Sequence, residues 1–394
     1  MTVSVASRST WLLALAGLLF LGGCEPESGP GTVHPVEARI PHFDNPDHTI
    51  TGESSPDRGG AAQLRGATRQ PAWSVGTREG AAPERFADIR DVEQDPQGRV
   101  LILDNENREV RVFTSDGEYV GTFGREGEGP GEFQYPAHLD ILEKNRLVVA
   151  GRMGRIQFFE PAGQTYERTG GFAVEFTPED ACVLDGRLYL HGALTKEGSS
   201  SVHVYTPRGE RKTSFGPVYD AENQFIRFQL SRGAVACDSS TDTVVFGFAA
   251  APMLYGFAPD GTRKWVSRIQ PFDPMPQTQG VSEQGTTRLR HSYEPGTDIL
   301  SELTDVPGPG LVAQRYRYPA DDEDRADTSI FTYWVSGTDG TGTFVRRGSI
   351  GGPAMGHLTH ASSTHLFSAR SAPIPSVVVY DARAVEWGPP KAAQ

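Results

Sequence analysis

Residues 125–133 read Arg125-Glu-Gly-Glu-Gly-Pro-Gly-Glu-Phe133, and 47 positions earlier the chain reads Arg78-Glu-Gly-Ala-Ala-Pro-Glu-Arg-Phe86. The same offset of 47 aligns Arg146-Leu-Val-Val149 with Arg99-Val-Leu-Ile102, so a loop and an apolar strand share one register. Repeats of about 40–50 residues that contain several strands are typical of the blades of a β-propeller. The repeat therefore predicts an all-β chain made of stacked blades.

Outward from this pair, two kinds of apolar segment recur six times each. Second strands are expected at 100–103, 147–149, 188–190, 244–246, 311–313 and 366–367, and third strands at 110–113, 156–159, 202–205, 253–257, 330–334 and 377–380. Turns such as Asp116-Gly117 follow the third strands and supply the positive φ of tight hairpins. We therefore predict a six-bladed β-propeller of four-stranded antiparallel blades over residues 71–394.

The last of these units ends soon after Tyr380 and lacks an outer strand. The stretch Ala72-Trp-Ser-Val75 lies just before the first complete unit, where an outer strand belongs. An open blade edge would leave backbone groups unpaired. We therefore expect this N-terminal strand to pair with the last blade and close the ring.

The N-terminal segment has the pattern of an export signal. Arg8 precedes the apolar run Trp11–Leu21, which is too short to span a bilayer comfortably, so residues 1–23 are predicted to be a removed signal peptide. The motif Leu21-Gly-Gly-Cys24 resembles a bacterial lipobox, and this resemblance implies that Cys24 becomes the lipid-modified first residue of the mature protein. A plain secretory signal with an incidental Cys24 is the alternative. By the same analogy Glu25 favours the outer membrane, with the body periplasmic or surface-facing.

Composition sets further limits. Residues 24–70 are rich in Pro, Gly, Glu and Ser with few large apolar side chains, so they are predicted to form a flexible linker between the anchor and the body. The 394 residues carry a net charge of −13, which argues against nucleic-acid binding because a phosphate backbone needs clustered Lys and Arg.

One segment carries a family resemblance. Asp104-Asn-Glu-Asn-Arg-Glu-Val-Arg-Val-Phe113, followed by Asp116-Gly117, the run Phe123–Phe133 and Pro136, resembles an NHL-type repeat. With its lipobox, the whole chain resembles bacterial six-bladed β-propeller lipoproteins. The family's usual His-Arg pair before the third strand is replaced here by Arg108-Glu109.

An alignment of the inner strands suggests a ring of polar residues around the channel. His138 is aligned with Asp91 one unit earlier, and later units place Glu179, Ala234, Glu302 and His357 at the same position. These positions lie near the starts of inner strands and ring the mouth of a propeller channel. Imidazole and carboxylate groups there could bind Zn²⁺ or Ca²⁺ or act in acid–base chemistry. The alternatives are a wet channel with solvated side chains, or a one-residue slip that turns them onto a blade face.

The two remaining cysteines, Cys182 and Cys237, occupy matching positions on neighbouring blades. Matching positions point the same way around a ring, so we expect two buried free thiols. A disulfide, which an exported compartment permits, is the alternative.

A long insertion from about Pro271 to Asp298 exceeds a normal hairpin. Within it Arg288, Arg290, His291 and Tyr293 form a basic and aromatic patch on an acidic protein. Long loops on a rigid scaffold are often binding elements, so these four residues are candidates for partner contact. A surface excursion without a function is the alternative.

Three functions remain open from the sequence, which contains no Gly-x-Ser-x-Gly, His-Glu-x-x-His or phosphate-loop motif. The favoured one is a lipid-anchored propeller that binds a protein, peptide or glycan through one face without catalysis. The second is a metal-dependent enzyme, similar to lactonases or lyases, with its site at the channel mouth. The third is a structural element of an envelope complex. Fold alone does not choose among them.

Overall fold

The computed structural model describes residues 33–35, 46–52, 67–68, 70–80, 82–192, 200–221, 224–274, 277–281, 287–291, 296–319, 328–350, 355–371, 373–383 and 385. The predicted signal peptide, the predicted lipidation site Cys24 and the contact candidate Tyr293 lie outside these residues. No helix among the described residues is both long and apolar enough to cross a membrane.

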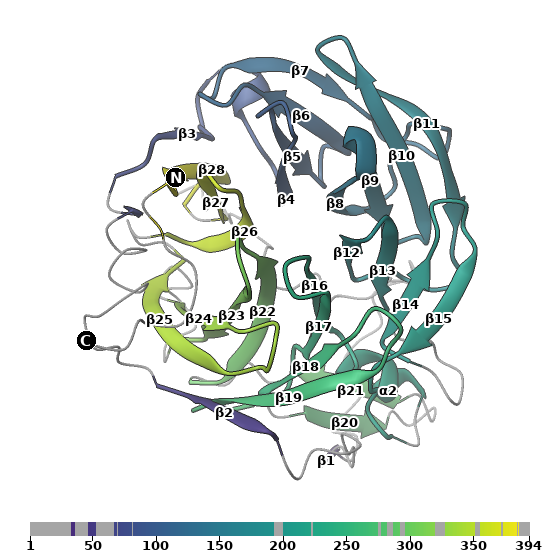
Figure 1. Ribbon diagram of the computed structural model, residues 1–394, viewed down its shortest axis with the longest axis vertical. Coiled ribbons are helices and arrows are strands. Elements are labelled where there is room, and N and C mark those ends of the chain that lie inside the picture. The colour runs from purple at the N-terminus through teal and green to yellow at the C-terminus, as the bar shows by residue number, and fades with distance from the viewer. Residues whose placement is uncertain are drawn as a thin grey trace, which may run out of the picture.

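Six sheets, each containing four antiparallel strands, surround a central axis within the described residues, as predicted (Figure 1). The first blade contains β4 (Ile89–Gln94), β5 (Val100–Asp104), β6 (Glu109–Phe113) and β7 (Tyr119–Phe123). The second contains β8 (Pro136–Leu142), β9 (Arg146–Gly151), β10 (Arg155–Ala162) and β11 (Thr165–Ala173). The third contains β12 (Asp180–Leu184), β13 (Arg187–His191), β14 (Val202–Tyr205) and β15 (Arg211–Phe215).

The remaining blades follow the same plan. The fourth contains β16 (Gly233–Asp238), β17 (Thr243–Phe248), β18 (Met253–Phe257) and β19 (Arg263–Gln270). The fifth contains β22 (Asp298–Asp305), β23 (Leu311–Arg317), β24 (Ser329–Val335) and β25 (Gly342–Ser349). The sixth contains β26 (His357–Ala361), β27 (His365–Arg370), β28 (Ser376–Asp381) and the N-terminal β3 (Trp73–Val75). Short helical elements are η1 (Ala82–Glu84), η2 (Glu143–Asn145) and α2 (Gln224–Leu230).

The predicted ring closure is confirmed. Strand β3 pairs antiparallel with β28, with Val75 opposite Val377 and Trp73 opposite Val379. The indole Nε1 of Trp73 also donates to the carbonyl oxygen of Ser115 in the first blade, at 2.8 Å. The N-terminal strand therefore joins the last blade to the first.

The predicted linker over residues 24–70 is wrong in two places. Strand β2 (His48–Thr51) pairs in parallel with β19 as a fifth strand of the fourth blade. Its Ile50 is fully buried among apolar residues of the fourth and fifth blades. Gly342 makes room for it, because a Cβ atom there would lie 2.7 Å from Ile50 Cδ1. Strand β1 (Val33–Pro35) also pairs, with β20 (Gln277–Val281), in a small sheet with β21 (Thr287–His291). One apolar residue of an otherwise polar segment is thus buried between two blades.

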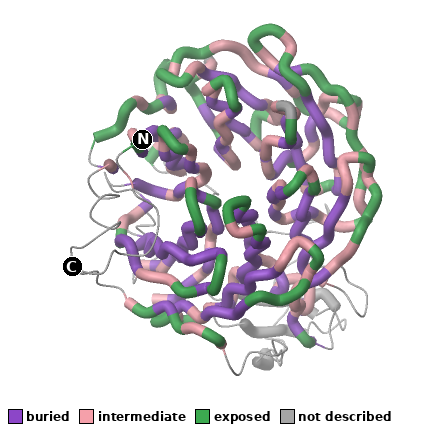
Figure 2. The backbone as a smooth tube through the Cα atoms, viewed as in Figure 1, coloured by how far each residue is buried: buried purple, intermediate pink, exposed green. Residues whose placement is uncertain are grey.

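The core lies between neighbouring blades. Residues Val100–Leu103 of β5 are all fully buried, because both faces of a blade pack against other blades (Figure 2). Leu101 and Leu103 thus share one apolar cluster with Leu139 and Val149 of the second blade. Buried residues follow the inner and middle strands, and exposed ones gather on the outer strands (Figure 2).

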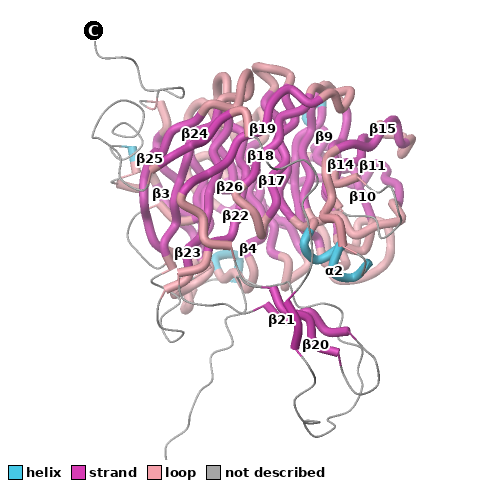
Figure 3. Tube along the Cα trace, turned by 90° about the horizontal axis from the view of Figure 1, so that it is seen from below, coloured by secondary structure: helices cyan, strands magenta, loops and turns pink. Residues whose placement is uncertain are grey.

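The two ends of the disc differ. We call the end at which the inner strands β4, β8, β12, β16, β22 and β26 begin the mouth face, and the opposite end the turn face. Helix α2 and the pair β20–β21 are on connections that lead into inner strands, and Figure 3 shows them on the same side of the disc. The third and fourth strands of each complete unit meet at the turn face in short turns.

Glycines in these turns sit beneath aromatic rings of the preceding blade. Gly117 (φ +91°) and Gly340 (φ +75°) have positive φ. A Cβ atom on Gly117 would lie 2.8 Å from the ring of Trp73, and one on Gly340 would lie 2.4 Å from the ring of Trp265. The Asp-Gly turns read from the sequence therefore serve both the hairpin and the joint between blades.

Candidate functional site

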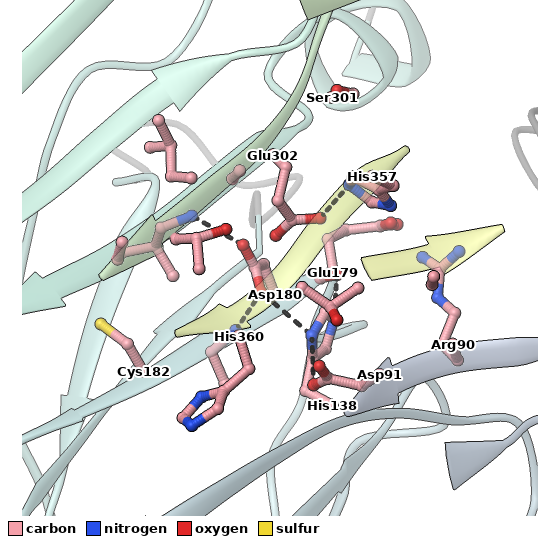
Figure 4. Close-up of a pocket in the computed structure, with 18 of the residues that line it drawn as sticks. Arg90, Asp91, His138, Glu179, Asp180, Cys182, Ser301, Glu302, His357 and His360 are labelled. Carbon is pink, nitrogen blue, oxygen red and sulfur yellow. Dashed lines mark hydrogen bonds and ion pairs between the residues drawn. The ribbon is translucent and has the colours of Figure 1, made fainter. Parts of the chain in front are cut away.

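A cavity of about 320 Å³ occupies the channel, and inner-strand residues of all six blades line it (Figure 4). The predicted ring residues Asp91, His138, Glu179, Glu302 and His357 are all among the lining residues. The cavity is central because each inner strand is closest to the axis. The cavity therefore contains the ring of residues predicted from the sequence.

The strand register decides which residues are equivalent. Asp91 is opposite Leu103, His138 opposite Ala150, Glu302 opposite Gln314 and His357 opposite Ala369, and these partners are equivalent positions of the second strands. The structure thus places these four as aligned from the sequence.

The third blade differs from the alignment by one residue. Asp180, not Glu179, occupies the equivalent position, opposite His191. The reason is the hairpin, because Leu184 pairs with Arg187 there whereas Leu142 pairs with Arg146 in the second blade. A turn that is one residue shorter shifts the inner strand against the second strand.

His138 lies between two carboxyl groups. Its Nδ1 is 3.0 Å from Asp180 Oδ1 and 3.9 Å from Asp91 Oδ2, while its Nε2 hydrogen-bonds the carbonyl oxygen of Glu179 (Figure 4). Burial disfavours the charged ring, but Asp180 and then Asp91 outweigh it and raise the pKa of His138. Both ring nitrogens face acceptors, which suits the imidazolium form.

Three carboxyl groups join neighbouring inner strands. Asp91 accepts hydrogen bonds from the backbone N–H of Val92 and, in the next blade, of Leu139, both at 2.8 Å. Asp140 and Asp180 repeat this arrangement toward Val183 and Val235 of the blades that follow them. Burial, partly offset by His138, raises the pKa of Asp91 to about 8. These three carboxyls therefore hold the blades together as well as line the cavity.

On the other side of the cavity, His357 pairs with Glu302. His357 Nε2 is 2.8 Å from Glu302 Oε2, and the two residues come from adjacent blades (Figure 4). The ring of Tyr316 meets the imidazole edge-on, with centroids 5.7 Å apart. An imidazole, a carboxylate and a phenol thus converge on one wall.

A second layer of polar residues lies two or three positions further along the inner strands, and sequence reasoning missed it. Glu93 and His360 belong to this layer, with His360 Nδ1 at 3.2 Å from Glu93 Oε1. Burial opposes the charge, but Glu93 outweighs it and raises the pKa of His360 to about 9. Side chains two positions apart on a strand share a face, so Glu93 could have been predicted to face the cavity from the position of Asp91. A bulge between Leu358 and His360 hides the equivalent relation on β26.

The prediction of free thiols is wrong. Cys182 and Cys237 form a disulfide between β12 and β16, with Cα atoms 5.7 Å apart. Both cysteines are in the second layer and line the cavity. Near the axis, matching side chains of adjacent inner strands converge instead of facing successive blades in turn. Matching side chains face successive blades in turn only further from the axis.

Three arginines at the mouth were also missed. Glu179, which the alignment had placed in the ring, meets Arg232 at 2.5 Å and Arg152 at 3.8 Å. Burial opposes its ionisation, but Arg232 and Arg152 lower the pKa of Glu179. Arg90 lines the same cavity. These residues come from four successive blades, so no local pattern in the sequence brings them together.

The partner-contact candidates lie elsewhere. Arg288, Arg290 and His291 are on β21, which pairs with β20 in the three-stranded sheet. That sheet is on the mouth face of the disc (Figure 3). Among the described residues, no three His, Cys, Asp or Glu side chains gather closely enough to hold a metal ion. The described ring residues therefore offer no donor set that fits the Zn²⁺ or Ca²⁺ considered from the sequence.

Comparisons with known proteins agree with the fold. Residues 85–213 match the model of a family described as a 6-bladed beta-propeller. Over 128 residues the chain is 29% identical to the human E3 ubiquitin-protein ligase NHLRC1, a match that covers 28% of this chain and 32% of that protein. The matched part therefore spans about a third of that relative.

Two solved structures have the same fold over most of the chain. One is a Bacteroides fragilis protein described as exported, with a TM-score of 0.54 and 10% identity over 84% of this chain and 98% of that one. The other is a Bacteroides vulgatus protein, with a TM-score of 0.50 and 8% identity over 80% and 96% of the two chains. At such identities the similarity shows the fold alone. The chain has the fold of a six-bladed β-propeller, and part of its sequence is similar to NHLRC1.

Proposed function

We propose that this chain is an exported propeller that is anchored by lipid at Cys24 and binds a protein, peptide or glycan partner through its mouth face, without catalysis. In this proposal residues 1–23 are removed on export, and the propeller begins near residue 71. The segment between them reaches the body and contributes β1 and β2 to it. The outer membrane is the proposed site of the anchor, by the analogy given above.

Export is supported by three observations. The lipobox-like sequence ends at Cys24. The disulfide between Cys182 and Cys237 suits an oxidising compartment, because cytosolic proteins rarely keep such bonds. A structure with the same fold is described as an exported protein. None of these depends on the other two.

The observation that carries the binding proposal is the asymmetry of the disc. The cavity opens among the starts of the inner strands, and both α2 and the β20–β21 pair are on connections at that same face. The turn face has short hairpins instead. A rigid scaffold that is elaborated at one face is typical of a binding protein.

Capture from envelope membranes tests the proposal. The full-length processed protein is compared with Arg288→Gln/Arg290→Gln on β21 and with Arg208→Gln, an exposed residue in the β14–β15 turn of the turn face. We expect a partner that wild type and Arg208→Gln capture equally and that the double variant captures at least tenfold less. Equal capture by all three would contradict binding through β21.

Cys24→Ser is expected to move the protein from the membrane to the soluble fraction, and unchanged sedimentation would contradict the anchor.

Catalysis at the channel mouth is the second candidate, and one observation favours it. The His357–Glu302 pair and the phenol of Tyr316 line the cavity together, and such groups can transfer protons. Hydrolysis of a lactone by the purified protein, lost in His357→Gln and kept in His365→Gln, would favour this candidate over binding alone.

A further inference from the structure

A group of residues at the mouth face of the first blades has the composition of a docking site. We call Arg90, Arg152 and Arg232, together with Tyr135 and Met153, the basic mouth patch. The three arginines line the cavity, and they come from three different blades. All five residues lie at or next to the starts of inner strands or in the β9–β10 turn, which is also at the mouth face.

Positive charge exceeds negative charge at this place. Glu179 is the carboxylate that contacts both Arg152 and Arg232. Burial, together with the neighbouring Arg90 and Arg232 and opposed by Glu179, lowers the pKa of Arg152 to about 10. Asp88 lies near Arg90, and although burial raises the pKa of Asp88 to about 6, it remains mostly ionised at neutral pH, so three guanidinium groups face two carboxylates. A local excess of guanidinium stands out on a chain whose net charge is −13.

Exposed apolar surface borders these cations. Tyr135 is 52% exposed and Met153 is 50% exposed, and among the described residues Tyr119 is the other large apolar side chain that is clearly exposed. The backbone N–H of Arg152 donates to the carbonyl oxygen of Tyr135 at 3.0 Å, so Tyr135 and Met153 both adjoin Arg152. The guanidinium of Arg108 lies over the Tyr135 ring, 4.5 Å from its centroid. Tyr119, in contrast, begins β7 at the turn face.

Side chains of this kind are those that dominate protein interfaces. Tyr, Met and Arg are enriched where proteins bind each other, and Tyr and Arg are frequent among the residues that contribute most to affinity. Guanidinium groups bind carboxylates through paired hydrogen bonds. A cavity of about 320 Å³ admits a side chain or a chain end but not a folded domain.

We propose that the basic mouth patch binds an acidic peptide segment of a protein partner. A carboxylate of the segment enters the mouth beside Arg90 and Arg152, and apolar side chains of the segment contact Tyr135 and Met153. This inference rests on the proposed function and specifies the partner as a protein with an exposed acidic segment. An acidic glycan would satisfy the arginines but has no need of Met153.

The test uses a displayed library of random peptides, selected on the full-length processed protein. Selected peptides and copies with each Asp or Glu replaced by its amide are then measured by fluorescence anisotropy. We expect the selected sequences to be rich in Asp and Glu. The amide copies and the Arg90→Gln/Arg152→Gln variant should each reduce affinity at least tenfold, and added salt should weaken wild-type binding.

Matched controls separate the patch from general charge and from misfolding. Arg208→Gln makes the same kind of charge change at the turn face and should leave affinity unchanged. Tyr135→Ser/Met153→Ser should reduce affinity, whereas Tyr119→Ser at the turn face should not. Urea unfolding tests whether each variant is folded. If a double variant is not folded, its two single variants are measured instead.

Each outcome decides between the proposals. Peptides that bind with dependence on Tyr135 and Met153 but not on Arg90 and Arg152 would overturn the acidic specificity and keep binding at the mouth face. If only the turn-face variants reduce peptide binding, the proposed face is overturned as well. An oligogalacturonate probe that binds with dependence on the arginines, when no peptide does, would replace the peptide by an acidic glycan.

Discussion

The turn face and the cavity wall of this propeller are built from the same strands but are held together in different ways. At the turn face, a glycine of one blade packs beneath an aromatic ring of the blade before it, as at Gly340 and Trp265. At the cavity wall, carboxyl groups such as Asp91 accept backbone hydrogen bonds from the next blade, and a disulfide joins the third and fourth blades.

The difference shows where the molecule can accommodate function. At the turn face the blades are joined by contacts between glycines and aromatic rings. The cavity wall instead keeps carboxyl, imidazole and guanidinium groups in an environment that shifts their pKa values. Groups with shifted pKa values are typical of functional sites, although structural networks also produce them.

Loss of the disulfide is expected to have the largest effect. Cys182→Ala/Cys237→Ala should lower the free energy of unfolding by roughly 2–5 kcal/mol, because the bond spans 55 residues and restricts the unfolded chain. Urea unfolding of the variant and of the wild type measures this difference in free energy. Two reactive thiols at these positions in the unfolded, unreduced wild type would contradict the bond.

The second largest loss of stability is expected from a change at the turn face, where a glycine packs beneath an aromatic ring. Gly340→Ala is expected to lower the free energy of unfolding by roughly 3 kcal/mol, because it adds a side chain at positive φ and forces it against Trp265. Gly163→Ala is the matched control, since Gly163 also has positive φ but a Cβ atom there meets nothing within 4 Å. Its expected loss is about 1 kcal/mol. If urea unfolding shows that Gly340→Ala and Gly163→Ala lose the same free energy of unfolding, the contact with the Trp265 ring does not have the role assigned to it.

The smallest expected effect is on pH dependence at the cavity wall. The folded pKa of His360, about 9, is above its ordinary value of 6.5. The folded state therefore holds an extra proton between these values, and stability should fall as pH rises from 6.5 to 9, by roughly 1–3 kcal/mol. Asp91, with its pKa raised to about 8, changes stability in the same direction.

Replacement of the pair sharpens this test. Glu93→Gln/His360→Gln removes the imidazole and the carboxylate that raises its pKa, so it should reduce the fall in stability measured by urea unfolding at pH 6.5 and pH 9 to the part that Asp91 causes. His365→Gln is the control, because His365 is on the same blade and outside the cavity lining. A double variant whose stability falls as steeply as that of wild type would show that other groups cause the effect.

Much of the fold could be predicted because its signals are local. The apolar strands, the Asp-Gly turns and the 47-residue repeat give six blades, and Trp73–Val75 closes the ring as expected. The candidate site was harder. Asp91, His138, Glu302 and His357 were aligned correctly, but a hairpin shorter by one residue put Asp180 where Glu179 was expected. Such offsets depend on turn geometry that composition does not reveal.

The sequence by itself determined the all-β class, the number of blades and the strand that closes the ring, because strand period and turn chemistry act over a few residues. Only the tertiary structure decided that Cys182 meets Cys237, that Ile50 is buried between two blades, and that Arg152 and Arg232 share Glu179. Each of these contacts joins segments from different blades or from outside them. Their meeting depends on how a closed ring brings its inner strands together at the axis and its blades together at the rim.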